Sequence, residues 1–269
     1  MVIDSLHAKG FEAYAVGGCV RDTILAREPD DWDITTSASP QQVKEIFDRT
    51  VDTGLEHGTV TVLAGSGAHE VTTYRIDGEY EDGRHPKEVV FTSSLAEDLR
   101  RRDFTINAMA WSLDADSFGE LVDPFDGMYD LEECIIRTPC DPDITFSDDP
   151  LRMMRAVRFA SQLGFTIEEE TFDAIRRNAP RIGIVSRERI AAELNKIVLS
   201  PVPSIGFELL EATGLLERIF PELHNLKGVE KRGAHAHKDN FVHTLKVLDN
   251  VARHSDDLWL RWAAVLHDI

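Results

Sequence analysis

Alternating apolar and polar positions mark several short stretches in the first part of the chain. They predict strands over residues 11–16, 31–36, 58–64 and 69–75. The last two are separated by the glycine-containing turn of a hairpin. Residues 2–9 are expected to form a short helix that Gly10 ends, and a second helix is expected to begin at Ser39, which precedes a proline. This part of the chain is therefore expected to be built on a sheet.

Further along, the pattern changes to the spacing of amphipathic helices. One helix is predicted from Ser147, as its N-cap, to a stop at Gly164. Thr166 begins a capping-box pattern, and two more helices are predicted over residues 186–199 and 204–213. The second part of the chain is therefore expected to be helical.

The composition is that of an ordinary soluble protein, with 42% hydrophobic and 29% charged residues among 269. A chain of this length favours two domains over one. No apolar run is long enough to span a bilayer, and the N-terminus lacks the pattern of a secretory signal, so a cytoplasmic location is expected. Cys19, Cys134 and Cys140 fit neither a disulfide framework nor a structural zinc site.

The formal net charge of −19 argues against binding of a polyanion, which usually requires a basic surface. Basic residues nevertheless cluster at residues 100–102, 152–158, 176–189 and 227–238. A local basic patch can bind one nucleic-acid arm while the acidic remainder of the protein discourages nonspecific binding.

Asp31 and Asp33 are the first candidates for chemistry. If residues 31–36 form a strand, the two side chains share one face and lie about 7 Å apart. Two hard oxygen donors at this separation suit Mg²⁺ that is held partly by the protein and partly by substrate phosphates. Taken alone, such a pair in an acidic protein is more often part of a solvated turn. The neighbouring residues are therefore needed to distinguish a metal site from a turn.

The segment just before this pair has the features of a phosphate site. Gly17 and Gly18 let backbone N–H groups approach an anion closely, and a helix is predicted from Cys19 onward. Arg21 would add a forked donor. The two segments together indicate a place where carboxylates, a metal ion and phosphates meet.

The sequence GGCVRD, followed after a short spacer by DWDITT, resembles the opening signature of the tRNA nucleotidyltransferase and poly(A) polymerase family. This family is the class II branch of the DNA polymerase β superfamily. The resemblance implies that Asp31 and Asp33 are catalytic and bind Mg²⁺, and that Gly18 and Arg21 hold the incoming triphosphate. The family often has a third metal-binding carboxylate at the position of Glu70, although an exposed strand glutamate is an equally good interpretation.

The sequence RRDFTINA, which includes Arg102, matches the second motif of the family nearly letter for letter. The match implies that Arg102 contacts the nucleotide. Asp103 and Asn107 would then support the site, although buried capping explains them equally well. The polar and aperiodic stretch 76–90 is similar in position to the flexible loop that family members use when the added base changes.

The sequence DPLRMMRAVRF, which begins at Asp149, matches a third motif of the family. The match implies that Asp149 and Arg152 read the base, since a carboxylate accepts from an exocyclic amine while a guanidinium donates to ring nitrogen or carbonyl oxygen. Arg155 and Arg158 would serve the nucleotide and support the helix. A stripe of charges paired at i,i+3 is the alternative interpretation. Asp148 departs from the pattern, because the family usually has Glu there.

The last residues resemble the start of an HD phosphohydrolase domain, whose His…His-Asp set binds a divalent metal. The candidate ligands are His243, His267 and Asp268, although a lone histidine is more often structural than a ligand. Because the chain ends one residue after Asp268, before a further aspartate ligand, we expect it to be a piece of a longer protein.

The resemblance covers residues 11–225 and implies an α+β fold in three parts. A nucleotidyltransferase head similar to polymerase β, with a small mixed sheet, is expected over residues 1–138. A helical neck and body that binds the base and tRNA is expected over residues 139–225, and the start of an HD helical domain over residues 226–269.

The resemblance implies a nucleotidyltransferase that uses Mg²⁺ and adds C, C and A from CTP and ATP to the 3′ end of tRNA without a nucleic-acid template. A poly(A) polymerase, or an enzyme that adds only C or only A, shares the motifs and stays open. Two alternatives of other classes are an HD metal phosphohydrolase with a degenerate head and a noncatalytic RNA-binding module.

Overall fold

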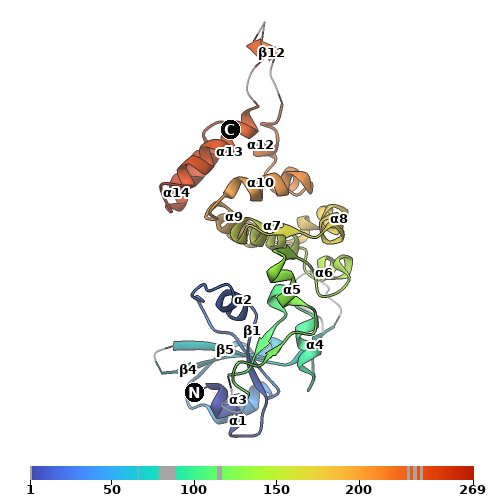
Figure 1. Cartoon of the computed structure of the whole chain (residues 1–269), viewed down its shortest axis with the longest axis vertical. Helices are drawn as coiled ribbons and strands as arrows, with labels where there is room; N and C mark the ends of the chain where they lie inside the picture. Colours follow the sequence, from blue (N-terminus) through green and yellow to red (C-terminus); the bar gives the residue numbers. More distant parts are fainter. Residues whose placement is uncertain are drawn as a thin grey trace. The chain divides into compact units, whose positions relative to one another are not determined.

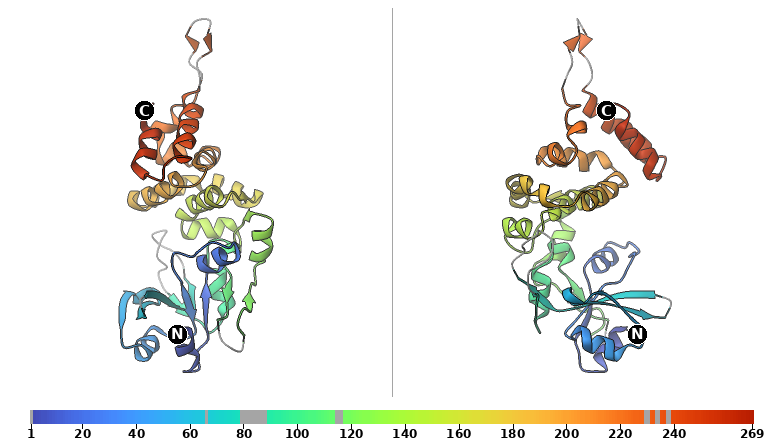
Figure 2. Two further views of the ribbon diagram at one scale, coloured as in Figure 1. Left: turned by 60° about the vertical axis from the view of Figure 1, so that its left-hand side comes forward. Right: turned by 180° about the vertical axis from the view of Figure 1, so that it is seen from behind.

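A computed structural model describes residues 2–65, 67–78, 89–113, 117–228, 231–232, 235–236 and 239–269. The chain forms two compact units, one made mostly of residues 1–140 and the other mostly of residues 141–269, with Cys134–Ile136 in the second (Figures 1 and 2). None of the helices in the described ranges is long and apolar enough to cross a membrane.

Within the described residues, the first unit contains a mixed sheet of seven strands in the order β3-β4-β5-β2-β1-β8-β9. Strands β2 and β5 run parallel, and the other neighbours run antiparallel. The strands are β1 (Ala13–Val16), β2 (Ile34–Thr36), β3 (Thr50–Gly54), β4 (Thr59–Ala64), β5 (Gly67–Thr73), β8 (Ala110–Trp111) and β9 (Leu121–Val122). A separate antiparallel ribbon joins β6 (Arg75–Asp77) to β7 (Val89–Phe91). The expected small mixed sheet and the β4–β5 hairpin are confirmed.

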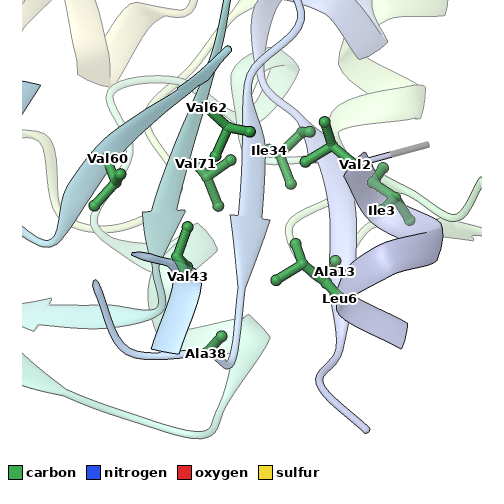
Figure 3. Packing of buried hydrophobic residues seen from close by; sticks show 10 residues of the cluster. All are labelled: Val2, Ile3, Leu6, Ala13, Ile34, Ala38, Val43, Val60, Val62 and Val71. Carbon is green, nitrogen blue, oxygen red and sulfur yellow. The ribbon is translucent and has the colours of Figure 1, made fainter. Parts of the chain in front are cut away.

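Two helices, α1 (Val2–His7) and α3 (Pro40–Ile46), pack on one face of this sheet (Figure 3). They bury an apolar cluster to which the strands contribute Ile34, Val60 and Val71, among others. Because successive side chains of a strand point to opposite faces, the residues next to these in sequence point away from the cluster.

Four short helical elements complete the first unit beside η1 (Leu55–His57). They are α2 (Gly18–Ile24), α4 (Leu95–Arg100), η2 (Thr105–Asn107) and α5 (Gly127–Glu132). Leu99 of α4 packs with Val16, Ala108 and Ala110 in a second apolar cluster. Helix α4 therefore brings its polar residues close to the strands at the centre of the sheet.

The second unit is helical, as expected. Its helices are α6 (Pro142–Asp148), α7 (Leu151–Leu163), α8 (Glu169–Asn178), α9 (Arg187–Val198), α10 (Pro203–Ala212), α11 (Leu216–Ile219), α12 (Pro221–His224), α13 (Asn240–Ala252) and α14 (Leu258–Leu266). Its other elements are η3 (Ala179–Ile184), the parallel pair β10 (Ile135–Ile136) and β11 (Thr166–Ile167), and the antiparallel pair β12 (Lys231–Arg232) and β13 (His235–Ala236). A Cβ atom at Gly206 of α10 would lie 2.4 Å from the Ile197 side chain of α9, so only glycine allows these helices to pack so closely.

Three predicted boundaries are wrong. The strand predicted over residues 31–36 begins only at Ile34. The helix predicted from Ser147 is two helices, because Pro150 lacks the N–H that would continue α6 and restricts Asp149 to an extended conformation. Thr166 lies in β11, and the side chain that caps α8 is that of Glu168, which accepts from Thr171 N at 2.8 Å.

The loop predicted over residues 76–90 is also partly wrong, because β6 and β7 occupy its two ends. Residues 79–88 lie outside the described part of the chain, so the proposed role of this loop stays a prediction.

Candidate active site

Asp33 and Glu70 lie beside each other where β2 and β5 run parallel. Ile34 is paired with Val71 in this register, so the residues that precede them, Asp33 and Glu70, are also neighbours. The carbonyl oxygen of Asp33 accepts from Val16 N of β1 at 3.0 Å, which ties the start of β2 to the middle of the sheet. Since Ile34 and Val71 belong to the apolar cluster under α1 and α3, the two carboxylates point to the opposite face.

Trp32 and His69 confirm this alternation. They line an apolar pocket of the first unit together with Val2 and Ile34, on the face that α1 covers. The acidic residues and the apolar residues of these two segments therefore alternate between the faces of the sheet.

The carboxylate of Asp33 is affected by the charges of two other carboxylates, those of Asp31 and Glu70. Burial, together with the negative charges of Asp31 and Glu70, raises the pKa of Asp33 to about 6, while the positive charge of Arg102 opposes the rise. Asp31 and Glu70 therefore lie near enough to Asp33 for their charges to act on it, although Asp31 and Asp33 both precede β2, which begins at Ile34. A divalent cation would relieve the mutual repulsion of these hard oxygen donors, so the three residues fit a metal site.

A glycine turn lies next to Arg102. Gly17 has φ +82°, and a Cβ atom there would lie 3.1 Å from Arg102 Nη1. At Gly18, by contrast, a Cβ atom would make only an ordinary contact, 3.7 Å from Arg21 Nη2. Of the two glycines, it is thus Gly17 whose backbone requires glycine, while Gly18 is the first residue of α2.

Arg21 lies beneath this turn and is only 9% exposed. Its Nε and Nη2 donate to the Asp22 carboxylate at 2.9 and 2.8 Å, and its Nη1 donates to Asn107 Oδ1 at 2.7 Å. Asn107 Nδ2 in turn donates to Asp103 Oδ1 at 3.0 Å. Arg21, expected from sequence to contact triphosphate, is therefore held by bonds within the protein, and Asp103 and Asn107 lie behind it in the supporting positions expected of them.

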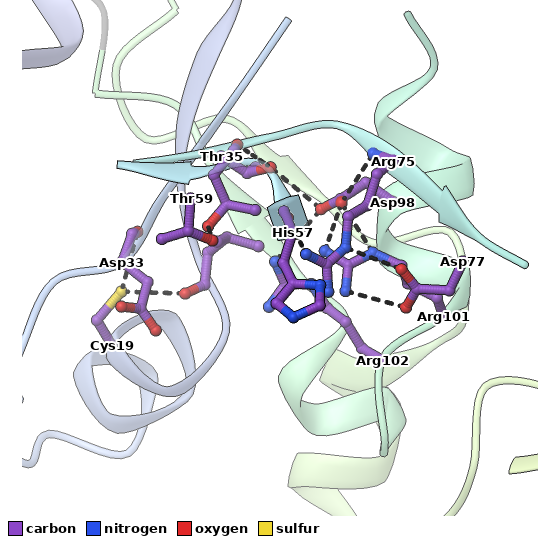
Figure 4. A network of polar contacts seen from close by, with 12 residues as sticks. Cys19, Asp33, Thr35, His57, Thr59, Arg75, Asp77, Asp98, Arg101 and Arg102 are labelled. Carbon is purple, nitrogen blue, oxygen red and sulfur yellow. Dashed lines mark hydrogen bonds and ion pairs between the residues drawn. The ribbon is translucent and has the colours of Figure 1, made fainter. Parts of the chain in front are cut away.

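Asp98 is a site residue that the sequence pattern did not single out. Its buried carboxylate accepts from Thr35 Oγ1 of β2 at 3.1 Å, from the Arg101 guanidinium at 2.7 Å and from Arg102 Nη2 at 3.3 Å (Figure 4). An acidic residue in the first turn of α4 is a common feature of helices, so the local pattern did not indicate these long-range contacts.

In the second unit, Asp149 joins two helices. Its Oδ1 accepts from Leu151 N at 3.1 Å at the start of α7, and its Oδ2 accepts from Arg189 Nη2 of α9 at 2.7 Å. Arg152, three residues further along, is half-buried in the first turn of α7. Asp149 and Arg152 thus both lie at the N-terminal end of α7, and Arg189 is a partner of Asp149 that sequence reasoning missed.

Arg158 lies on the buried side of α7. Its Nε is 2.7 Å from Glu193 Oε2 of α9, and its guanidinium lies 4.1 Å from the centre of the Phe159 ring. Arg155 is half-buried, with its guanidinium 5.6 Å from the same ring. Of the two roles expected of Arg158, the structure shows support of the helix.

A group of possible metal ligands forms in the second unit. His243 on α13 and the pair His267 and Asp268 after α14 have ligand atoms that all lie within 4.8 Å of one another. The three candidates that the sequence singled out are therefore brought together by the packing of α13 against α14.

Comparison with known proteins agrees with this division of the chain. Residues 13–137 match the family described as the poly A polymerase head domain, and residues 164–227 match the family described as the probable RNA and SrmB- binding site of polymerase A.

Known relatives share much of the sequence. The chain is 49% identical over 216 residues to the CCA-adding enzyme of Limosilactobacillus reuteri, covering 80% of this chain and 53% of that protein. Two solved structures are also similar. The Bacillus stearothermophilus CCA-adding enzyme in complex with CTP has a TM-score of 0.73 and 44% identity over 80% of this chain and 51% of that one. A tRNA nucleotidyltransferase complexed with a primer tRNA and an incoming ATP analog has a TM-score of 0.72 and 27% identity over 100% of this chain and 76% of that one.

The chain spans about half the length of the curated relative it matches. Over that half, the order of the matched regions, the sequence identity and the fold of the carboxylate-bearing sheet agree with one another. The chain belongs to the tRNA nucleotidyltransferase and poly(A) polymerase family.

Proposed function

We propose that this protein adds C, C and A to the 3′ end of tRNA from CTP and ATP without a nucleic-acid template. The observation that carries the proposal is the effect of the Asp31 and Glu70 charges on Asp33, which neighbours Glu70 beside β2 and β5, with Arg102 beside the Gly17 turn. The similarity to proteins named CCA-adding enzyme supports the choice of nucleotides and of tRNA as the acceptor. The same similarity favours CCA addition over poly(A) synthesis.

The metal in this proposal is Mg²⁺, held by Asp31 and Asp33 with Glu70 as the third carboxylate. Hard carboxylate oxygens suit this ion, and the raised pKa of Asp33 reflects a concentration of negative charge that a divalent cation would offset. When bound, Mg²⁺ supplies activation of the RNA 3′-hydroxyl and neutralisation of the phosphates in a two-metal transfer.

The protein residues would bind and orient the reacting groups. The backbone of Gly18 and the guanidinium of Arg102 contact the triphosphate, while Arg21 fixes the glycine turn from beneath. The RNA 3′-oxygen forms a bond to the α-phosphorus and its proton passes to water. The bond from the α-phosphorus to the oxygen bridging to the β-phosphate breaks, and that oxygen leaves with the electron pair as part of pyrophosphate.

Selection of the base belongs to the second unit in this proposal. The Asp149 carboxylate accepts from the exocyclic amine that C and A share, and the Arg152 guanidinium donates to the adjacent ring nitrogen or carbonyl oxygen. Arg155 supports the nucleotide from the next turn of α7, and Arg158 holds α7 on α9. On their Watson–Crick edges, U has no amine and the amine of G lies beside an N–H donor, so both bases are rejected.

The test is incorporation of single labelled nucleotides into tRNA that lacks its 3′ CCA. We expect CTP alone to add two residues, ATP to add one residue after them, and Asp31→Ala and Asp33→Ala to abolish both additions. The control is Asp52→Ala, which removes an exposed acid paired with Lys44 and should leave incorporation unchanged. Incorporation of ATP alone, repeatedly and into any RNA, would replace CCA addition with poly(A) synthesis.

A second candidate function is supported by His243, His267 and Asp268, whose ligand atoms lie close enough to share a metal ion. It is a metal-dependent phosphohydrolase activity of the second unit. This activity should survive Asp31→Ala and be lost on His267→Ala, whereas incorporation of CTP should show the reverse pattern. Loss of both activities in both variants would rule out two independent sites.

A further inference from the structure

Asp98, which the sequence patterns did not single out, accepts five hydrogen bonds within the described part of the first unit. It is fully buried, and its two oxygens accept hydrogen bonds from three segments of the chain. Oδ1 accepts from Arg75 N, at the start of β6, at 3.3 Å and from Arg101 Nε and Nη2 at 3.1 and 2.7 Å. Oδ2 accepts from Thr35 Oγ1 and Arg102 Nη2 at 3.1 and 3.3 Å (Figure 4).

The two oxygens have different neighbours. Oδ1 faces Arg101, whose guanidinium also lies 3.6 Å from Asp77 at the other end of β6. Oδ2 faces β2, where Thr35 is two residues after Asp33, and it also receives Arg102. One oxygen therefore holds the β6 segment, while the other connects the strand that follows Asp33 to Arg102.

Arg102 is held from one side only within the described part of the chain. Its Nη2 is bound to Asp98, and its Nη1 lies against the Gly17 turn. Its Nε is buried and has no hydrogen-bond partner among the described residues. A buried donor of this kind is costly unless a ligand or water satisfies it, so the guanidinium is oriented but not saturated.

The protonation state of Asp98 favours a strong bond to Arg102. Burial alone would raise the pKa of its carboxyl group, but the charges of Arg101 and Arg102 and the hydrogen bonds to it hold the pKa below its usual range. Asp98 is therefore ionised at neutral pH, and its bond to Arg102 is charge-assisted.

We propose that Asp98 is a positioning residue for nucleotidyl transfer, which fixes the Arg102 guanidinium at the Gly17 turn and ties it to the strand that follows Asp33. The inference rests on the proposed function, because it takes Arg102 as the group that contacts the triphosphate. Asp98 itself does not touch the nucleotide. Its effect on nucleotide binding is therefore expected to pass entirely through Arg102.

A double-mutant cycle between Asp98→Asn and Arg102→Ala tests this dependence. In the otherwise unchanged protein, Asp98→Asn should raise KM for CTP about 10- to 100-fold and change kcat less. The reason is that Arg102, which donates to the triphosphate, loses the charge-assisted bond that orients it. In the Arg102→Ala background, Asp98→Asn should cause no further rise. Equal rises in both backgrounds would overturn the proposal and leave Asp98 as a purely structural residue.

A milder variant tests the same proposal if Asp98→Asn fails to fold. Thr35→Val removes only the hydroxyl that donates to Oδ2, and it should raise KM for CTP a few-fold in a way that also disappears with Arg102→Ala. The matched control is Arg101→Ala, which removes the guanidinium on the other oxygen and should leave KM nearly unchanged. A larger rise in KM for Arg101→Ala than for Asp98→Asn would contradict the proposal.

The two proposals fail differently. If the unsubstituted protein neither binds CTP in the presence of Mg²⁺ nor incorporates it, the proposed function fails. If it does both and the cycle is additive, only the role of Asp98 fails.

Discussion

Arg21 Nη1 lies 2.7 Å from the amide oxygen of Asn107, although 86 positions separate the two residues in the chain. This bond joins the GGCVRD segment to the RRDFTINA segment, so the two motifs form one structure. Asn107 also donates to Asp103, which places a continuous polar chain beneath the Gly17 turn.

Asn107→Ala should therefore loosen the turn. We expect the free energy of unfolding to fall by about 1–3 kcal/mol, because buried polar partners lose their hydrogen bonds. KM for CTP should rise as well, since Arg21 loses the acceptor that orients it. Urea unfolding and steady-state kinetics measure the two effects, with Asn225→Ala as a control at an exposed asparagine. A normal KM together with reduced stability would separate Arg21 from nucleotide binding.

The raised pKa of Asp33 predicts a pH-dependent cost in stability. The folded, metal-free protein holds the Asp33 proton up to about pH 6, against an ordinary value of 3.8 in the unfolded chain. The folded state therefore binds the proton more tightly, and the free energy of unfolding falls as pH rises between these two values. Above about pH 6 the cost is fully present.

Asp33→Asn removes this cost because the side chain no longer ionises. In thermal unfolding with a metal chelator, the variant should be more stable than the unsubstituted protein at about pH 8, and the difference should vanish near pH 4. Glu56→Gln, at an exposed glutamate, serves as the control. A difference in stability that does not depend on pH would show that the pKa of Asp33 is not raised in the folded protein.

The pair of Arg158 and Glu193 predicts a stability effect without a direct nucleotide contact. Both side chains are buried, so Arg158→Met should lower the free energy of unfolding by about 3 kcal/mol, because it leaves the Glu193 carboxylate with only the longer, 3.5 Å contact to Lys196 Nζ. Adding Glu193→Leu should recover most of the loss. The exposed pair of Arg176 and Asp173 is the matched control, where Arg176→Met should cost less than about 1 kcal/mol. A stable Arg158→Met variant with lost CTP binding would instead place Arg158 at the nucleotide.

Arg261 anchors α14 within the second unit. Its buried guanidinium donates to the carbonyl oxygens of Val198 and Ser200, at the end of α9, and to that of Ala252 at the end of α13. Arg261→Met should lower the free energy of unfolding by about 3 kcal/mol or more, because these buried carbonyls lose their donors. Arg261→Lys should not restore it, since an ammonium group lacks the planar fork. The exposed Arg253→Met is the control, and equal stability of the two Met variants would contradict the account.

The site residues that could be predicted from sequence are those that belong to short contiguous motifs. Asp33 and Arg102 stand in contiguous motifs, and alternation of side chains placed Asp33 on the face opposite Trp32 and Ile34. Asp98 and Arg189 could not be predicted, because their roles depend on partners brought near by folding, 63 and 40 positions away in the chain.

The wrong boundaries have a similar cause. Pro150 suits the first turn of a helix as well as a break between helices, and only the packing of α6 and α7 decides between them. The three candidate ligands His243, His267 and Asp268 were found because they resemble a known set, whereas their proximity depends on how α13 packs on α14.

The most direct test of the central claim is the anomalous scattering of Mn²⁺ in crystals grown with CTP. We expect Mn²⁺ between the carboxylates of Asp31 and Asp33, with the triphosphate against the Arg102 guanidinium. Mn²⁺ found only at His243, His267 and Asp268, with CTP remote from the sheet, would contradict it.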